Sequence, residues 1–298
     1  MITATSMLYL YVETPLHVGA GSGLSSIDLP IQRERTTQYP MIQGSGIKGR
    51  LRTTVADSID DAALFSAIFG PDSRARDAGE HAGALIAGDA RILLFPVRSL
   101  SGVFAYTTSR DVLARFKRDF ERIGSELPWN VPAATNDALV TTRSKVQVNN
   151  TLVLEDFSFN ARLDAQVDRI ADWLAEQALP DLSAGDYWRD KIRNALVILP
   201  EDDFRDFALY ATEVITRIRI DRDTRTVESG ALWTEEHLPS DTLLYVPIYA
   251  TDARRSGKNG ARISGKEILA AVRPTSNYLQ LGADETVGRG IVRLRWQS

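Results

Sequence analysis

The stretch LHVGAGSGLSSIDLPIQRER, residues 16–35, decides how the rest of the chain is organised. It follows a short apolar segment, residues 8–12, which favours a β-strand. Glycines stand at three alternate positions in it, Gly19, Gly21 and Gly23. A backbone without Cβ atoms turns tightly and lets a partner approach closely. We therefore expect a strand that runs into a tight, NH-rich loop.

An aspartate and two arginines complete this stretch. Asp28 lies between the glycines and the pair Arg33 and Arg35. A carboxylate between an NH-rich turn and two guanidinium groups suits a phosphate-bearing ligand with a hydrated cation near the acid. The same residues also fit an ordinary glycine-rich surface loop with one solvated aspartate.

Composition restricts the class of protein. The 298 residues are 44% hydrophobic and 25% charged, as in a globular protein, and contain no cysteine. Disulfides and thiolate zinc sites are thus excluded, and the three histidines (His17, His81 and His237) show no metal-ligand spacing. No signal-peptide pattern and no long apolar run occur, so we expect a cytoplasmic protein without a membrane partner.

Charge is unevenly distributed along the chain. The net charge is −4, which argues against a protein that coats nucleic acid without regard to sequence. Residues 252–298, however, carry nine Lys or Arg residues against four acids. An acidic protein with one basic face still binds RNA, because the local field matters more than the sum.

Two further glycine-rich segments are candidate phosphate-binding sites, called phosphate seats below. Residues 44–52, GSGIKGRLR, place Ser45 and Lys48 where a helix is expected to begin, with backbone NH groups free to bind an anion. The G-x-G-x-x-G pattern here does not indicate a dinucleotide fold, because the preceding run is short and contains a proline. The basic residues also fit a solvated helix face. The second segment, residues 282–290, contains Arg289 between two glycines.

Residues 212–233 predict a β-hairpin. Aliphatic residues and arginines alternate with a period of two up to the turn-like Asp221–Thr224, and a return strand follows. Four arginines lie on one arm and its tip: Arg217, Arg219, Arg222 and Arg225. They indicate an anionic partner, or alternatively an edge hairpin that charge protects from aggregation.

Elsewhere the hydrophobic pattern predicts an α+β fold. Strands are expected at residues 7–13, 84–97 with a kink at Gly88 and Asp89, 145–148, 152–159, 241–249 and 291–296. Helices are expected at residues 60–69, 109–123, 165–178, 186–196, 201–210 and 266–272. Residues 72–83 predict a mobile loop and residues 124–150 a mostly irregular region.

With these segments assembled, the sequence resembles the major backbone RAMP subunits of type III-B (Cmr) CRISPR effector complexes. These are the repeated subunits that cleave target RNA. Five stretches carry the resemblance, in the same order along the chain: residues 15–35, 40–52, 88–99, 228–245 and 278–292. The likeness therefore spans nearly the whole sequence.

The resemblance implies a ferredoxin-like (RRM-type) palm with inserted helical regions and a protruding thumb β-hairpin. One RAMP domain would span residues 1–298, with the thumb insertion at 212–245 and variable insertions at 70–83 and 124–210. It also implies a subunit that polymerises along CRISPR RNA beside other subunits of the complex and cuts complementary target RNA at regular intervals. Base pairing would then read the sequence, and the protein would read backbone and shape.

The resemblance also implies site residues. Asp28 matches the cleaving aspartate and would bind a divalent ion, Mg²⁺ or alternatively Mn²⁺. His17 would assist proton transfer, or is simply a buried histidine that orders the loop. The RNA-binding candidates are Ser45, Lys48, Arg33, Arg35, Gly282 and Arg289, with Arg217 and Arg219 assigned by region.

Other functions stay open at this point. The chain could be a purely architectural RNA-binding subunit of the same complex, with no cleavage of its own. A metal-independent guide-processing nuclease is a third reading, but such chemistry usually needs a histidine acid–base pair, and histidine is scarce here. A dinucleotide-dependent enzyme is a remote fourth.

Overall fold

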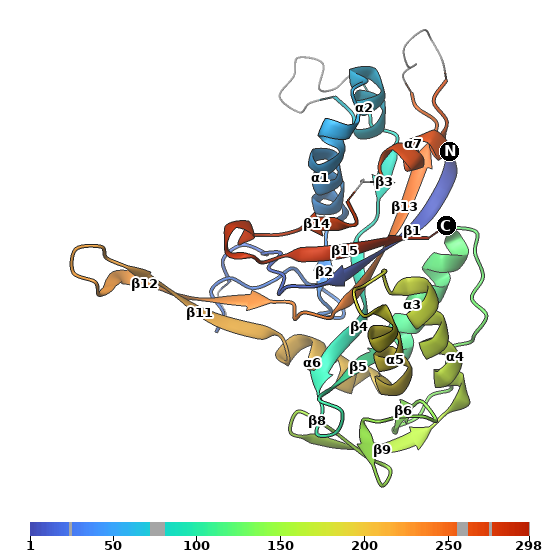
Figure 1. The fold of residues 1–298 in the computed structure, drawn as a ribbon, viewed down its shortest axis with the longest axis vertical. Coiled ribbons are helices and arrows are strands. Elements are labelled where there is room, and N and C mark those ends of the chain that lie inside the picture. Colours follow the sequence, from blue (N-terminus) through green and yellow to red (C-terminus); the bar gives the residue numbers. More distant parts are fainter. Residues whose placement is uncertain (24–25, 72–80, 255–261, 274–275, 298) are drawn as a thin grey trace.

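The computed structural model describes residues 1–23, 26–71, 81–254, 262–273 and 276–297. The chain forms a mixed α+β structure around one large, mostly antiparallel sheet. A separate two-stranded hairpin projects to one side of it (Figure 1). The α+β class expected from the sequence is confirmed.

The first strand, β1 (Ile2–Val12), lies inside the sheet. It pairs antiparallel with β13 (Leu243–Thr251) on one edge and with β15 (Ile291–Trp296) on the other. Residues 6–12 are all buried, which explains why aliphatic and aromatic residues follow one another there without polar alternation. The strands expected at both ends of the sequence are thus present.

Beyond β13 the sheet continues with β3 (Leu85–Ala87) and β4 (Ala90–Arg98). Both pair with β13, and the break between them falls at Gly88 and Asp89, as the sequence predicts. The strand order β15–β1–β13–β4 is antiparallel throughout.

Helices follow two of these strands. After β1 and the short β2 (Met41–Ile42), α1 (Gly44–Val55) buries Ile47, Leu51 and Val55 at intervals of four residues and packs against β3. α7 (Gly265–Ala271) packs on β1 and β13, and a capping box of Ser264 and Glu267 fixes its start. Between α1 and β3 lie η1 (Ala56–Ser58) and α2 (Ala62–Phe69).

The far half of the sheet differs from the expected helical insertion. Residues 124–210 do form α4 (Ala165–Trp173), the π-helical turn η2 (Leu174–Ala178), α5 (Gly185–Ala195) and α6 (Glu201–Tyr210). They also add five strands to the sheet: β6 (Ala138–Val140), β7 (Gln147–Val148), β8 (Thr151–Leu154), β9 (Phe157–Leu163) and β10 (Leu196–Leu199). These continue outward from β5 (Phe104–Ser109), which α3 (Arg110–Arg122) follows.

Two local predictions in this region are wrong. The single strand expected at 152–159 is the hairpin of β8 and β9, because the chain reverses at Glu155, whose φ is +47°. Sequence patterns also missed β10, since its four apolar residues follow α5 directly and pair in parallel with the distant β5. The loop expected at 72–83 lies mostly outside the described residues.

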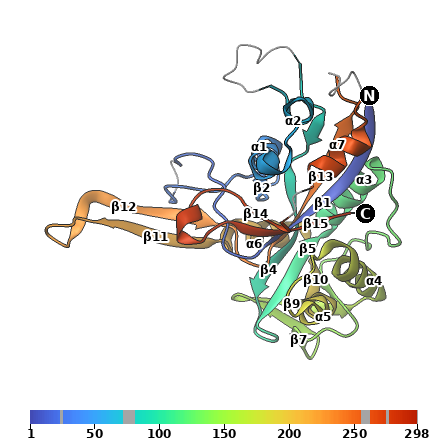
Figure 2. The same cartoon turned by 45° about the horizontal axis from the view of Figure 1, so that its top comes forward.

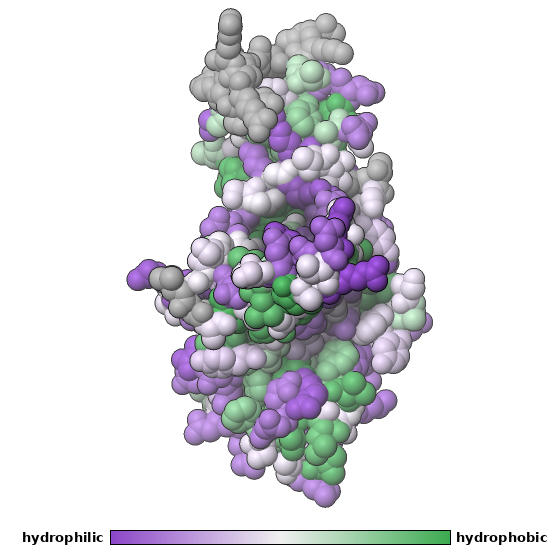
Figure 3. Space-filling view, turned by 90° about the vertical axis from the view of Figure 1, so that its left-hand side faces the viewer, coloured by the Kyte–Doolittle hydropathy of each residue, from purple (hydrophilic) through white to green (hydrophobic). Residues whose placement is uncertain are grey.

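The projecting hairpin consists of β11 (Glu213–Ile220) and β12 (Val227–His237), which confirms the predicted hairpin (Figure 2). Paired residues share a face, so Thr216, Ile218 and Ile220 lie on the same face as Thr234, Leu232 and Val227. This face exposes five aliphatic side chains: Val214, Ile218, Ile220, Val227 and Leu232. Figure 3, which looks at the molecule from the hairpin side, shows apolar patches among hydrophilic surface.

The chain ends with β14 (Tyr278–Gln280), the 3-10 turn η4 (Glu285–Val287) and β15. Within the described residues, no helix has the length and apolarity needed to cross a bilayer.

Candidate functional site

The glycine-rich loop of residues 16–35 lies along the base of the hairpin. Leu16 and Leu238 exchange two backbone hydrogen bonds of 2.9 Å, and the backbone of Leu29 bonds the oxygen of Thr234 and the NH of Glu236. Residues on either side of Asp28 are thereby held against β12. The loop and the hairpin, about 200 residues apart in sequence, form one structural unit.

Asp28 is fixed to β12 by Thr234. The backbone NH and the hydroxyl of Thr234 donate to Asp28 Oδ2 at 2.8 and 2.9 Å, and the NH of Asp28 donates to Thr234 Oγ1 at 3.0 Å. These bonds, first from the backbone and then from the side chain of Thr234, lower the pKa of Asp28 below its usual value. The side chain remains exposed, so a carboxylate faces solvent at the hairpin base.

Arg33 and Arg35 do not share one role in the structure. Arg33 forms a buried ion pair with Glu236, which also accepts hydrogen bonds from the Thr212 hydroxyl at 2.8 Å and the Ile31 NH at 3.0 Å. Its guanidinium is therefore used in joining the loop to the hairpin. The side chain of Arg35, by contrast, is exposed to solvent.

His17 is buried beside the same end of β12. Its Nδ1 lies 2.6 Å from the carbonyl oxygen of Glu236, and because a carbonyl only accepts, Nδ1 carries a proton. The imidazole ring lies 5.4 Å, centroid to centroid, from that of His237.

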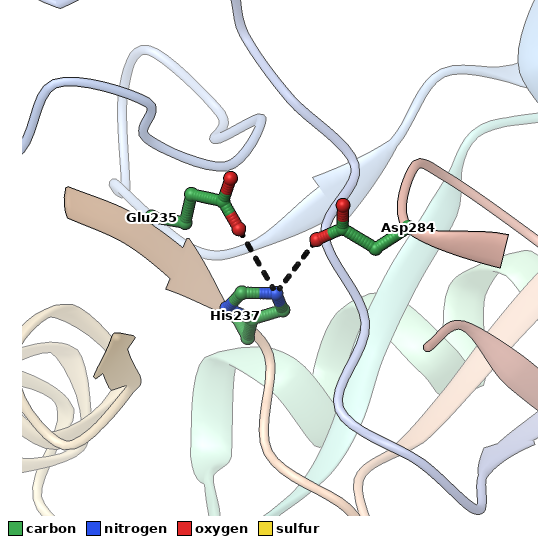
Figure 4. A group of neighbouring side chains, drawn as sticks. All are labelled: Glu235, His237 and Asp284. Atoms are coloured by element: carbon green, nitrogen blue, oxygen red, sulfur yellow. Dashed lines mark ion pairs between the residues drawn. The ribbon is translucent and has the colours of Figure 1, made fainter. Parts of the chain in front are cut away.

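The opposite face of the hairpin base carries a cluster of acid and imidazole groups. Glu235, His237 and Asp284 place one ligand atom each within 4.8 Å of the others, and they form a group that could hold a metal ion (Figure 4). Arg217 contacts both acids: its Nε is 2.9 Å from Glu235 Oε2 and its Nη2 is 3.0 Å from Asp284 Oδ2. Burial raises the pKa of Asp284, but the Glu235 hydrogen bond, Arg217 and His237 outweigh it and lower the pKa.

The two remaining glycine-rich segments face one groove. A cavity of about 430 Å³ is lined by Gly46, Gly49 and Arg50 of α1 and by Gly282 and Glu285 from the loop before β15. The Arg50 guanidinium is 3.9 Å from the Glu285 carboxylate. The structure thus brings together segments that the sequence indicated separately as phosphate seats.

The other RNA-binding candidates do not line this groove. Ser45 is exposed at the start of α1, whereas Lys48 turns its amine away to the Leu85 carbonyl of β3 at 2.8 Å. Burial lowers the pKa of Lys48. Arg219 pairs with Glu228 at 3.6 Å on the hairpin, and Arg289 is half-buried in the terminal loop.

A second cavity, of about 630 Å³, lies apart from these residues. Aromatic and acidic side chains of β9 and α6 line it, among them Phe157, Phe207, Tyr210, Asp203 and Asp206. It contains none of the predicted site residues.

The comparisons with known proteins agree with this architecture. The model of the RAMP superfamily matches residues 9–293. The chain is 41% identical over 290 residues to the CRISPR system Cmr endoribonuclease Cmr4 of Pyrococcus furiosus, covering 96% of this chain and 93% of that protein. This chain belongs to the Cmr4 family of RAMP proteins.

Solved Cmr4 structures have the same fold. The crystal structure of oligomeric Cmr4 from Pyrococcus furiosus superposes with a TM-score of 0.74 at 34% identity, covering 99% of this chain and 98% of that one. A chain of the type III-B Cmr-beta complex bound to cognate target RNA gives a TM-score of 0.76 at 22% identity, which shows likeness of fold alone.

Sequence patterns did not single out several residues that build this Cmr4-type site. Thr234 and Glu236 lie on β12 just beyond the predicted hairpin of residues 212–233, and alternation places them on one face. No local signal pairs them with Asp28 or Arg33, because those contacts depend on how the loop lies across the strand. Arg50 was indicated only as one of three helix cations.

Proposed function

We propose that this chain is the repeated backbone subunit of a type III-B CRISPR complex, which assembles along CRISPR RNA and cleaves complementary target RNA. The observation that carries the proposal is the exposed, ionised Asp28 held at the base of a projecting hairpin. The Cmr4 protein of Pyrococcus furiosus, which is named as an endoribonuclease, also supports the proposal. So does the crystal structure of oligomeric Cmr4 from the same organism.

In this proposal the hairpin is the thumb, and the sheet with its helices is a ferredoxin-like palm within a single domain. The strand order β15–β1–β13–β4, with α1 and α7 as its two helices, supports the palm. The exposed aliphatic face supports the thumb, because apolar side chains that enter a base stack unstack it and kink the strand. Each subunit would then interrupt guide–target pairing beside its own Asp28.

Guide RNA would lie in the groove between α1 and the loop of residues 282–290. Backbone NH groups of a helix N-terminus and a nearby guanidinium suit phosphate oxygens. Ser45, Arg50 and the backbone around Gly46 would contact the guide, with Arg35 and Arg289 as further candidates. Lys48 joins them only if its amine leaves the Leu85 carbonyl.

Asp28 fits a hydrated Mg²⁺ as a single direct ligand, because it is exposed, ionised and held in place by Thr234. The bound ion would supply charge stabilisation at the scissile phosphate. The target's own 2′-hydroxyl would attack that phosphate and the 5′-oxygen of the next nucleotide would leave. His17, with a proton on Nδ1 and therefore a lone pair on Nε2 when the ring is neutral, is the candidate for proton transfer.

The test uses the reconstituted complex with labelled complementary RNA and Mg²⁺. Asp28→Asn should retain RNA binding and abolish regularly spaced cuts, because it removes the charge and keeps the shape. Cuts that persist in this variant would overturn the assignment of Asp28. Binding without cuts in the wild type would leave the architectural alternative, a subunit that holds RNA and does not cleave it.

A further inference from the structure

His237 is a fully buried residue whose ring nitrogens have no hydrogen-bond partner among the described residues. Such groups are rare in folded proteins, because a buried polar atom without a partner is costly. A neutral imidazole ring keeps a lone pair on one nitrogen, which it can offer to a ligand. The described residues therefore offer no hydrogen-bond partner that compensates the burial of this ring.

The nearest polar atoms to this ring are carboxylate oxygens. Nε2 lies 3.5 Å from Asp284 Oδ2 and 4.0 Å from Glu235 Oε2, too far for hydrogen bonds but directed toward one common point (Figure 4). Ligands about 2.1 Å from a tetrahedral metal ion are separated from one another by about 3.4 Å. The two nitrogen–oxygen distances thus need to shorten by about 0.6 Å or less, and the three ligand atoms already lie within 4.8 Å of one another.

We propose that Glu235, His237 and Asp284 form a binding site for Zn²⁺ at the base of the hairpin. One imidazole nitrogen and two carboxylate oxygens are the donor set that favours zinc over Mg²⁺ or Ca²⁺, which prefer oxygen ligands alone. The indole NH of Trp233 donates to Glu235 Oε1 at 2.7 Å and leaves Oε2 directed at the site. A solvent molecule would complete the tetrahedron.

Arg217 is the cation that competes with the metal. It contacts the same two oxygens, Glu235 Oε2 and Asp284 Oδ2, and neutralises part of their charge. A carboxylate oxygen has a second lone pair, so Arg217 need not leave when an ion binds, but its charge opposes the ion. Removing that charge should tighten metal binding.

This site is separate from Asp28. Side chains alternate along β12, so Glu235 and His237 lie on the face opposite to Thr234, which holds Asp28. A metal here would tie the hairpin to the terminal loop through Asp284, and none of its ligands is Asp28.

Titration of the purified full-length chain with Co²⁺, a spectroscopic substitute for Zn²⁺, tests the proposal. The wild type should bind one equivalent with the intense visible absorption of a tetrahedral ion, and Zn²⁺ should displace it. His237→Gln and Asp284→Asn should weaken binding by at least about tenfold, and Arg217→Met should strengthen it. Circular dichroism checks that each variant is folded. If the change at the buried His237 prevents folding, Asp284→Asn alone tests the site.

Two control variants make the result specific. His81→Gln alters a histidine that bonds Ser66 instead, and it should bind Co²⁺ as the wild type does. Asp28→Asn should also keep the absorption. Loss of the band in Asp28→Asn, equal affinity in Asp284→Asn, or no tetrahedral band in the wild type would each overturn the proposal and leave an ionic cluster neutralised by Arg217.

Discussion

Thr234 and Asp28 hold each other by three hydrogen bonds across the junction of the hairpin and the glycine-rich loop. Thr234 donates twice to one carboxylate oxygen and accepts once from the Asp28 backbone. Any movement of the hairpin base therefore moves the carboxylate. Hairpin position and the proposed cleavage site are mechanically coupled at this one pair.

Thr234→Val should slow target cleavage about tenfold, because a valine of the same shape removes the hydroxyl and leaves Asp28 held by one backbone bond. Thr234→Ser should behave almost like the wild type. The lost hydrogen bond also raises the pKa of Asp28, so the acid limb of the pH–rate profile should move to higher pH in the valine variant. Cleavage rates from about pH 3 to 7 check both, because the ordinary pKa of an aspartate is about 3.9; equal profiles would contradict the coupling.

Glu236→Ala should lower the free energy of unfolding by about 3 kcal/mol, since it removes the buried carboxylate that pairs with the half-buried Arg33. Glu155→Ala, at the exposed pair with Arg98, should cost less than about 1 kcal/mol. Denaturant unfolding of the two variants provides the comparison. A similar loss in both would mean that Glu236 does not join the loop to the hairpin.

Gly282→Ala should destabilise the protein more than Gly288→Ala, although both glycines have positive φ. A Cβ at Gly282 would lie 2.1 Å from the backbone oxygen of His17, whereas a Cβ at Gly288 would meet no atom within 4 Å. The Gly288 change should cost only the backbone strain, about 1–2 kcal/mol. Thermal unfolding of both variants tests this difference, and equal melting temperatures would refute the close approach.

Arg50→Ala should weaken CRISPR RNA binding and reduce the slope of log affinity against log salt by about 1, as expected when one phosphate contact is lost. Lys117→Ala is the control, because that lysine, on α3, bonds Asn130 and does not line the groove. Titrations at several salt concentrations give the slope. An unchanged slope for Arg50→Ala would place the guide elsewhere.

Patterns within a few residues of one another were read correctly from the sequence. The burial of β1, the helical spacing of α1 and the alternation of the hairpin are local properties, and each predicted its element. The strand β10 was missed because its stability comes from pairing with β5, about 90 residues earlier.

The same limit applied to the site. Asp28 could be selected from its loop and its resemblance to a family, and its role as a catalyst stays a prediction. The buried pairing of Arg33 and the inward turn of the Lys48 amine depend on distant partners, Glu236 and Leu85. A charge pattern in the sequence cannot distinguish a cationic side chain that is available to a ligand from one that is already paired within the fold.

The position of β1 between β13 and β15 has a consequence for how the chain folds. The first strand finds both of its neighbours only among residues beyond 240, so its contacts are among the most distant that the sequence allows. Chains dominated by such contacts fold slowly, because the entropy of closing a large loop is lost before the strand pairing can stabilise the chain. During synthesis the apolar β1 stays unpaired until β13 and β15 have been made. We expect the chain to be most prone to aggregation, and to bind chaperones most, during this interval.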